Sequence, residues 1–260
     1  MGFIGSNGAG KTTTLKGILN MIHPDGGSVK IFGKEFRENE FDLKQDIAFM
    51  MGGSDYYIKK KLGVISEVVS RFYSNWDAET FAKLMKRFKL DPDKKVQELS
   101  QGMRIKFALS LALSHHAKLL ILDEPTSGLD PVARDNLLEL FQELVEDGRK
   151  SILFSTHITS DLEKCADYIT YINNGKIIES MTKDDLLQYY RLVNGGTGEL
   201  EQVKESLISY KKNSFGFIGL ARTELLSEHR SLNLNTETPT LDDIMIYYAK
   251  KEEDCEKSSL

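Results

Sequence analysis

The stretch GSNGAGKTTT at 5–14 has the residue types and the spacing of a phosphate-binding loop. It fits the pattern G-x-x-x-x-G-K-[ST], in which glycines let successive backbone N–H groups point at a phosphate. The pattern predicts that Lys11 reaches the β- and γ-phosphates of a nucleotide and that the Thr12 hydroxyl binds Mg²⁺. The alternative is a glycine-rich turn with a chance lysine, and the flanking strand and helix signals disfavour it.

A pair of acids follows the apolar run LLIL, at Asp123 and Glu124. Ligands of open parallel sheets bind at the carboxyl ends of the strands, where this pair would stand. Asp123 is therefore a candidate for the second shell of Mg²⁺, and Glu124 is a candidate general base for a hydrolytic water. Taken alone, the pair could equally cap a helix, but the phosphate loop favours the functional interpretation.

The pattern along the chain predicts the elements that must position these residues. MGFI before the loop is typical of the end of a strand. KTTTLKGILNMI, which overlaps the end of the loop, is typical of a helix. KLLILDEP at 118–125 and KSILFST at 150–156 are short apolar runs typical of buried parallel strands. Between about 54 and 116 the pattern is helical, and NGGTGE at 194–199 has the composition of a linker. These signals predict an α/β nucleotide core with a helical insertion and a C-terminal appendage.

Side chains that start helices sharpen three of the predicted boundaries. Asp130 is expected to cap the helix that begins at the following proline. Ser160 and Glu163 have the spacing of a capping box, as do Thr240 and Asp243. Asn174-Gly175 predicts a tight hairpin turn.

The composition restricts the class of protein. The chain has 260 residues, of which 40% are hydrophobic and 28% charged, as in ordinary globular domains. Its net charge of −5 argues against nucleic acid as the main partner, which would favour a basic face. Cys165 and Cys255 form neither a disulfide framework nor a metal-ligand spacing, which favours a reducing compartment. No apolar run approaches the roughly 18 residues that span a bilayer. We therefore expect a cytosolic chain, or one held at a membrane by a partner.

Four motifs in order carry a resemblance to a known family. LSQGM stands at 99–103, LLILDEP at 119–125, SGLD at 127–130 and STH at 155–157. With these motifs the chain resembles the ATP-binding-cassette (ABC) ATPases, in the branch of bacitracin-type drug-export and acetoin-type transporters. The resemblance covers residues 1 to about 190 strongly and the remainder loosely.

The resemblance implies a fold and a domain organisation. The fold is α/β, a P-loop NTPase with the RecA-like core of ABC ATPases at about 1–52 and 115–190. A helical signature subdomain occupies about 53–114, and residues 191–260 form a small α+β C-terminal extension. Members usually have about two strands before the phosphate loop, including an aromatic residue that stacks on adenine. We expect those N-terminal strands to be missing here. The stacking interaction of the aromatic residue, worth about 1–3 kcal/mol, would then be lost with them.

The resemblance also implies roles for individual residues. In this family each ATP lies between the phosphate loop of one protomer and the signature of a second. Ser100 and Gly102 would contact the partner's γ-phosphate, and Asp130 would lie at the dimer seam. Glu124 would be the base that polarises water, and His157 would sense the γ-phosphate. The implied ATP-binding set is Gly5, Ser6, Asn7, Gly8, Ala9, Gly10, Lys11, Thr12, Thr13, Ser100, Gly102 and Asp130, with Mg²⁺ at Thr12 and Asp123.

Besides the missing strands, two further departures from the family pattern stand out. The signature reads Leu-Ser-Gln-Gly-Met, where the commonest form has a glycine third and a glutamine last. The loop after IAFM usually carries a glutamine or glutamate that faces Mg²⁺. Here Gly52 or Gly53 takes that place, and Asp55 is the nearest substitute acid.

The expected function is that of an ATP-hydrolysing subunit of a multi-subunit ABC transporter, with export the favoured direction. Its expected partners are a second ATPase subunit, identical or not, and separate transmembrane permease subunits that hold it on the inner face of the membrane. One alternative is a nucleotide-binding regulatory module with little hydrolysis. Another is an ABC ATPase that acts away from membranes on nucleic acid or ribosomes. The short interval between Lys11 and Ser100 disfavours the latter, because it leaves no room for a long coiled-coil insertion.

Aromatic residues and the remaining histidines leave further alternatives open. One aromatic cluster could be core, or could line a groove for a transporter's cytoplasmic helix. It comprises Tyr56, Tyr57, Phe72, Tyr73 and Trp76. Four histidines match no site pattern and are expected to serve packing or the surface, namely His23, His115, His116 and His229.

Overall fold

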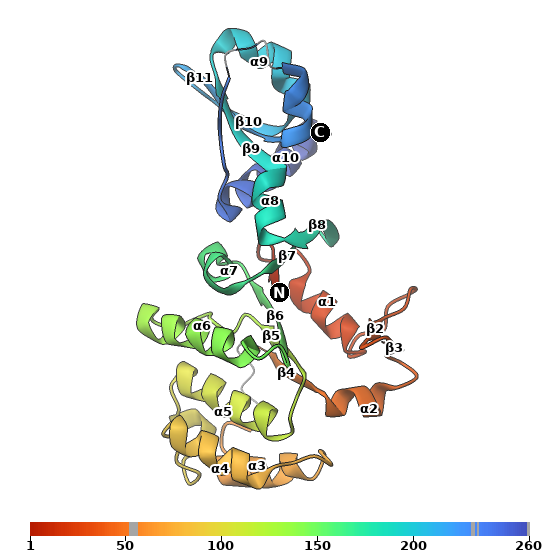
Figure 1. Ribbon diagram of the computed structural model, residues 1–260, viewed down its shortest axis with the longest axis vertical. Coiled ribbons are helices and arrows are strands. Elements are labelled where there is room, and N and C mark those ends of the chain that lie inside the picture. The colour runs from red at the N-terminus through yellow and green to blue at the C-terminus, as the bar shows by residue number, and fades with distance from the viewer. Residues whose placement is uncertain (52–56, 230–231, 233, 259–260) are drawn as a thin grey trace. The chain divides into compact units, whose positions relative to one another are not determined.

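A computed structural model of the chain describes residues 1–51, 57–229, 232 and 234–258. Figure 1 labels most of its helices and strands. The chain forms two compact units, one of Met1 and 11–156 and the other of Gly2–Gly10 and His157–Leu260. The domain boundary expected near residue 190 stays a prediction. Gly52, Gly53, Asp55 and Tyr56 lie outside the described residues.

The first unit alternates strands with helices and contains the helical insertion. Its strands are β2 (Lys30–Ile31), β3 (Lys34–Glu35), β4 (Ile47–Met51), β5 (Leu119–Asp123) and β6 (Ser151–Thr156). Its helices are α1 (Lys11–Ile18), α2 (Glu40–Gln45), α3 (Leu62–Ser70), α4 (Ala78–Arg87), the 3₁₀ turn Val96–Glu98, α5 (Gln101–Ser114) and α6 (Pro131–Val145).

The central strand of the first unit, β5, has a position that accounts for its apolar sequence. Strand β5 pairs in parallel with β4 on one side and with β6 on the other. Because it has neighbours on both edges and is covered on both faces, Leu120, Ile121 and Leu122 are almost fully buried. This confirms the two predicted buried parallel strands. The register places Asp123 opposite Ser155, so the polar ends of β5 and β6 meet.

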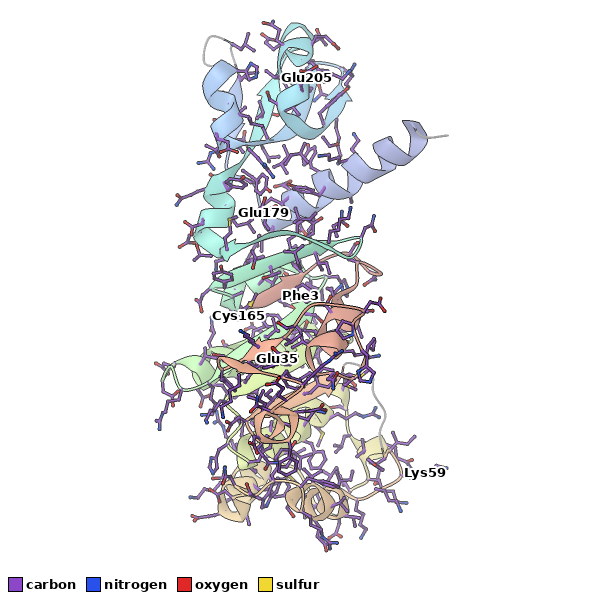
Figure 2. All side chains as sticks on the ribbon, turned by 90° about the vertical axis from the view of Figure 1, so that its right-hand side faces the viewer. Phe3, Glu35, Lys59, Cys165, Glu179 and Glu205 are labelled. Atoms are coloured by element: carbon purple, nitrogen blue, oxygen red, sulfur yellow. The ribbon has the colours of Figure 1, made fainter. Side chains whose placement is uncertain are left out.

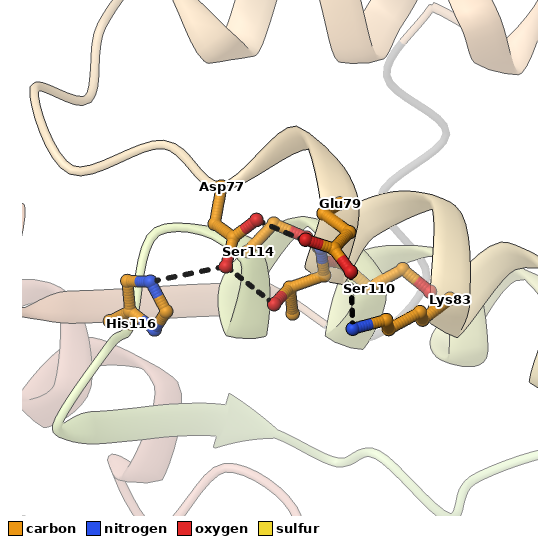
Figure 3. A network of polar contacts seen from close by, with 7 residues as sticks. Asp77, Glu79, Lys83, Ser110, Ser114 and His116 are labelled. Atoms are coloured by element: carbon orange, nitrogen blue, oxygen red, sulfur yellow. Dashed lines mark hydrogen bonds and ion pairs between the residues drawn. The ribbon is translucent and has the colours of Figure 1, made fainter.

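The helical insertion has its own apolar core, made by Leu62, Met85, Leu90, Val96, Leu99 and Phe107. Figure 3 shows how α4 is attached to α5. Asp77 caps α4 by accepting from the backbone N–H of Thr80 at 2.9 Å, and its own N–H donates to the Ser114 carbonyl at 2.7 Å. The side-chain hydrogen bond from Thr80 holds the pKa of Asp77 below its usual value. The predicted helical character of this region is confirmed for its described residues.

The second unit begins with β1 and continues after β6. Its strands are β1 (Gly2–Ile4), β7 (Tyr168–Asn173), β8 (Lys176–Thr182), β9 (Tyr190–Gly195), β10 (Leu207–Asn213), β11 (Gly216–Arg222) and β12 (Asn235–Glu237). Its helices are α7 (Thr159–Cys165), α8 (Lys183–Tyr189), α9 (Thr197–Val203), the 3₁₀ turns Lys204–Ser206 and Thr223–His229, and α10 (Leu241–Ser258).

Strand β1 pairs in parallel with β7, and β7 pairs antiparallel with β8. The turn between β7 and β8 has φ of 43° at Asn174 and 72° at Gly175. Left-handed conformations at both central residues are what a tight hairpin requires. The hairpin predicted at this dipeptide is therefore confirmed.

The end of the chain folds as a four-stranded antiparallel sheet in the order β10-β11-β9-β12. The linker predicted at 194–199 is wrong. Asn194 and Gly195 belong to β9, where they pair with Ile218 and Phe217 of β11. A Cβ at Gly195 would lie 2.7 Å from the Phe217 ring, so this glycine serves close packing rather than flexibility.

Two of the three predicted helix caps are present. Asp130 accepts from the N–H groups of Val132 and Ala133, and Thr240 exchanges hydrogen bonds with Asp243. The capping box predicted at Ser160 and Glu163 is wrong, because α7 begins at Thr159 after the N-cap residue Ile158, which makes no side-chain cap. Glu163 instead accepts from the N–H of Leu241 at 3.3 Å.

Candidate nucleotide-binding site

The phosphate loop connects β1 to α1. Gly8 and Gly10 have φ of 81° and 106°, in the left-handed region that a side chain rarely adopts. The loop is tied to the β7–β8 turn by a hydrogen bond from the N–H of Gly175 to the Ala9 carbonyl, at 2.9 Å. Gly5 is buried and Ser6 and Asn7 are exposed, as is Thr13 in the following helix. The loop thus presents its middle residues to solvent on an anchored backbone.

At the start of α1 in the first unit, the Lys11 side chain is only 6% exposed. Its Nζ lies 3.3 Å from Oε1 of Glu124, which is 20% exposed. A buried ammonium group needs a compensating charge, and Glu124 supplies one. The predicted phosphate ligand and the predicted base therefore face each other.

Asp123 is bonded through both of its carboxylate oxygens. Oδ2 accepts from the Thr12 hydroxyl at 2.8 Å, and Oδ1 accepts from the Ser155 hydroxyl at 2.6 Å. Oxygen donors of this kind suit Mg²⁺, which is usually bound by one or two protein carboxylates or hydroxyls together with phosphate oxygens. The two predicted metal-binding side chains therefore lie in contact.

Ser155 belongs to the site, although the STH motif did not single it out. It is fully buried, donates to Asp123 and accepts from the N–H of Glu124 at 3.0 Å. One hydroxyl therefore orients both acids. The available signals were its place in the STH motif and the parallel register, which sets Ser155 beside Asp123.

Glu124 has an uncommon backbone conformation for a residue with a side chain. Its φ is 50°, and its N–H donates to both the hydroxyl and the carbonyl of Ser155. Such conformations cost roughly 1–3 kcal/mol and cluster at functional sites, where the surrounding contacts maintain them. Here the contacts with β6 maintain it.

The signature residues lie at the start of α5. The Ser100 hydroxyl accepts from the N–H of Met103 at 3.4 Å and is exposed. A Cβ at Gly102 would meet nothing closer than 3.8 Å, the distance to a methyl carbon of Leu129. Glycine in a helix costs about 1 kcal/mol relative to alanine, so packing within this chain does not explain Gly102. A ligand or partner close to this backbone would explain it.

Glu124 also lines a cavity of about 420 Å³ in the first unit, together with Gln101, Arg104, Tyr57 and apolar side chains. Tyr57 is 71% exposed and Phe72 is 70% exposed, which places both at the surface. Tyr73 and Trp76 pack internally, against His115 and Phe81. The aromatic cluster is therefore divided between packing and surface.

Three of the remaining histidines lie at packing or surface positions, as expected, since His115 is buried and His23 and His116 are exposed. His115 is buried and stacks on Tyr73 with ring centroids 3.7 Å apart. Burial lowers its pKa. His116 is exposed and lies near Asp77, as Figure 3 shows.

Cys165, labelled in Figure 2, is a free thiol in the described part of the chain. Burial raises its pKa to about 11. A thiol with such a pKa carries little of the reactive thiolate form at neutral pH.

The predicted residues therefore fall into three groups. Lys11, Thr12, Asp123 and Glu124 form one connected cluster in the first unit. Ser100, Gly102 and Asp130 lie at the starts of α5 and α6 in the same unit. Gly5–Gly10 and His157 belong to the second unit, where His157 is exposed just after β6.

A phosphate loop that follows a strand, together with an acid at the carboxyl end of a parallel strand, defines the class of P-loop NTPases. Comparisons with known proteins narrow the class. The family model described as ABC transporter matches residues 1–127. The chain is 32% identical to the ABC transporter ATP-binding protein NatA of Bacillus subtilis (strain 168), and the match covers 68% of this chain and 74% of NatA. The chain belongs to the family of ABC transporter ATP-binding proteins.

Two further comparisons agree with the resemblance. The bacitracin transport ATP-binding protein BcrA of Bacillus licheniformis is 32% identical over 71% of this chain and 61% of its own length. A solved structure described as the ATP-binding subunit of an ABC transporter is 28% identical, with a TM-score of 0.63, over 71% of this chain and 79% of that one. Several curated relatives are longer than the matched region, and the chain spans about three fifths of their length. The P-loop NTPase fold and the likeness to the bacitracin-type branch are thus confirmed.

Proposed function

We propose that this chain is the ATP-binding and ATP-hydrolysing subunit of a multi-subunit ABC transporter, with export as its direction. The observation that carries the proposal is the cluster of Lys11, Thr12, Asp123 and Glu124, oriented by Ser155. The cluster combines a phosphate ligand, two oxygen donors for a metal ion and a candidate base. These are the parts that hydrolysis of a nucleoside triphosphate needs.

The triphosphate would bind to the backbone N–H groups of Gly5–Thr13 and to Lys11. The Thr12 hydroxyl and Asp123 would hold Mg²⁺, since both offer oxygen atoms and lie 2.8 Å apart. The metal ion would neutralise charge on the phosphate oxygens. In the described residues no cluster of three or more histidine, cysteine or acidic side chains could hold a metal ion. A magnesium site completed by the nucleotide needs no such cluster.

Glu124 would act as the general base. In the present structure its carboxylate is 3.3 Å from Lys11, so a phosphate that attracts Lys11 would release Glu124 to accept a proton from water. His157 would contact the γ-phosphate. Because Glu124 keeps its left-handed backbone through Ser155, the base would be positioned before substrate arrives.

The site would be completed by a second ATPase subunit, identical or not. Ser100 and Gly102 would approach the nucleotide of that subunit, which accounts for a helical glycine without internal packing. Asp130 would lie at the dimer seam. Residues 1–190 would be the ATPase domain, with its core at about 1–52 and 115–190 and its helical subdomain at about 53–114. Residues 191–260 would be an extension.

Transmembrane permease subunits would hold the chain on the inner face of the membrane. None of the described helices is both long enough and apolar enough to cross a bilayer. Tyr57 and Phe72 are exposed aromatic side chains on the helical insertion or next to it, which suits contact with a partner.

Phosphate release by wild type and by Glu124→Gln tests the proposal. We expect Mg²⁺-dependent release by the wild type and a loss of about 100-fold or more in the variant, the contribution typical of a general base. Glu205→Gln is the matched control, because Glu205 is an exposed glutamate of the extension, labelled in Figure 2. Equal release by wild type and Glu124→Gln would refute the assignment. A regulatory module would bind ATP and release no phosphate in either form.

A further inference from the structure

We propose that Asp242, on the C-terminal helix α10, is a positioning residue for His157 and acts through Thr159. The proposal rests on the proposed function, in which His157 senses the γ-phosphate. It adds a part of the chain outside the ATPase motifs to the machinery of that site.

The link is short and direct. Thr159 follows His157 by two residues and is the first residue of α7. Its side chain is 5% exposed, and its hydroxyl donates to Oδ1 of Asp242 at 2.7 Å. One turn further along α7, Glu163 accepts from the N–H of Leu241. The start of α10 therefore contacts the first two turns of α7.

Helix α7 is short and depends on contacts with the rest of the chain. It has seven residues, and its N-cap residue Ile158 makes no side-chain cap. Isolated helices of this length are not stable in water, so tertiary contacts must hold the helix. At its first turn, the Thr159 hydroxyl is bonded to Asp242 from a distant part of the chain, and Leu162 is fully buried.

Helix α10 is itself well anchored. The capping box between Thr240 and Asp243 uses Asp243 and leaves Asp242 to reach Thr159. Farther along, the Tyr247 hydroxyl donates to the Ile218 carbonyl of β11 at 3.2 Å. The Tyr248 hydroxyl lies 2.8 Å from that of Tyr190.

Tyr190 extends this anchor to β8. It is buried and donates to Glu179 at 2.8 Å, and Glu179 is labelled in Figure 2. Burial raises the pKa of Tyr190, which keeps its hydroxyl protonated as a donor. Asp242 is therefore held by a helix that is fixed to two sheets of the second unit. Its hydrogen bond with Thr159 restrains the position of Thr159 in turn.

The consequence concerns His157. The residue is exposed, whereas Thr159 is buried and bonded to Asp242, so the chain passes from the surface to a buried, hydrogen-bonded side chain within two residues. Loss of the Thr159–Asp242 bond would loosen that side chain and widen the range of positions of the imidazole. A sensor of the γ-phosphate that is less well placed would slow hydrolysis and distinguish ATP from ADP less well.

Matched substitutions in the full chain test this. Thr159→Val removes the hydroxyl and keeps the shape, whereas Thr159→Ser keeps the hydroxyl. Asp242→Ala removes the acceptor, whereas Asp242→Asn keeps an acceptor oxygen. We expect Thr159→Val and Asp242→Ala to lower kcat by about 3- to 10-fold, the range of one hydrogen bond. KM for ATP should change by less than about two-fold, and Thr159→Ser and Asp242→Asn should stay near wild type.

A second readout separates positioning from general weakening. In the Glu124→Gln background, the preference for ATP over ADP in equilibrium binding should fall by a similar factor in Thr159→Val and in Asp242→Ala. The double variant should lose no more than either single one, because both remove the same bond. Wild-type kcat and wild-type preference in Thr159→Val would overturn the proposal, as would equal losses in Asp242→Asn and Asp242→Ala.

The proposed function can fail separately. If the wild type releases no phosphate, that function is wrong, and hydrogen exchange of the backbone amides at 157–161 then decides the positioning claim. Faster exchange in Thr159→Val than in Thr159→Ser supports it. Equal exchange in the two overturns it.

Discussion

The ends of β5 and β6 and the start of α7 are two polar regions of this protein that are held in different ways. At Asp123 the partners come from the register of neighbouring strands and from the helix that follows the phosphate loop. At Thr159 the partner is Asp242, 83 residues further along the chain. The first arrangement follows from a local motif in a parallel sheet. The second depends on how the end of the chain folds back.

The comparison predicts that substitutions in the cluster at the strand ends abolish ATP binding or hydrolysis. Substitutions at the start of α7 should only reduce hydrolysis. Lys11→Ala should have the largest effect. Truncation of one member of a buried charged contact typically costs 2–5 kcal/mol, so ATP binding should fall by about 30-fold or more. Equilibrium binding of ATP measures this, with the exposed Lys30→Ala as control. Affinity within a few-fold of wild type would show that the loop does not hold phosphate through Lys11.

Ser155→Ala tests whether one hydroxyl orients both acids. We expect hydrolysis to fall by about 10- to 100-fold, because small misplacements of reacting groups have effects of that size. The free energy of unfolding should fall by about 1–3 kcal/mol, since buried partners lose a hydrogen bond. The control is Ser151→Ala, at the exposed first residue of the same strand. Full activity in Ser155→Ala would mean that the backbone of β6 alone holds Glu124.

Gly102→Ala should separate stability from activity. A Cβ there has room, at 3.8 Å from its nearest neighbour, and alanine favours the helix. We expect the free energy of unfolding to rise by up to about 1 kcal/mol while hydrolysis falls by about 10-fold. Gly17→Ala, also in a helix and without near neighbours, should stabilise without loss of activity. Unchanged hydrolysis in Gly102→Ala would remove the argument that another subunit approaches this glycine.

His115 provides a small, pH-dependent test of long-range packing. Burial lowers its pKa in the folded protein, so the unfolded chain takes up the proton first as the pH falls. The resulting stability is present above the usual histidine pKa of about 6.5 and is lost as the pH falls below it, by at most about 1.4 kcal/mol per pH unit. Urea unfolding between pH 7.5 and about 5 should show this slope.

His115→Gln should remove that part of the slope, and His116→Gln, at an exposed neighbour, should leave it. Equal slopes in wild type and His115→Gln would mean that burial against Tyr73 does not hold the imidazole neutral.

The parts that could be predicted are those in which local pattern and contact coincide. The glycine spacing predicted the loop, and the apolar run before Asp123 predicted a buried strand, because both signals lie within a few residues of the feature. Ser155 could not be singled out, since its role depends on the register between β5 and β6. Glu163 was assigned to a local cap because spacing alone does not reveal that Leu241 competes for it. The strand pairing of Gly195 was missed for the same reason, as its composition is that of a linker.

The role proposed for Glu124, the base of an ATPase site, can be tested in one experiment. The most direct measurement is the identity of the nucleotide that the protein holds after incubation with Mg²⁺ and ATP. We expect the wild type to hold ADP and the Glu124→Gln variant to hold ATP, since the variant binds without hydrolysing. ADP in both, at equal rates of formation, would contradict the claim.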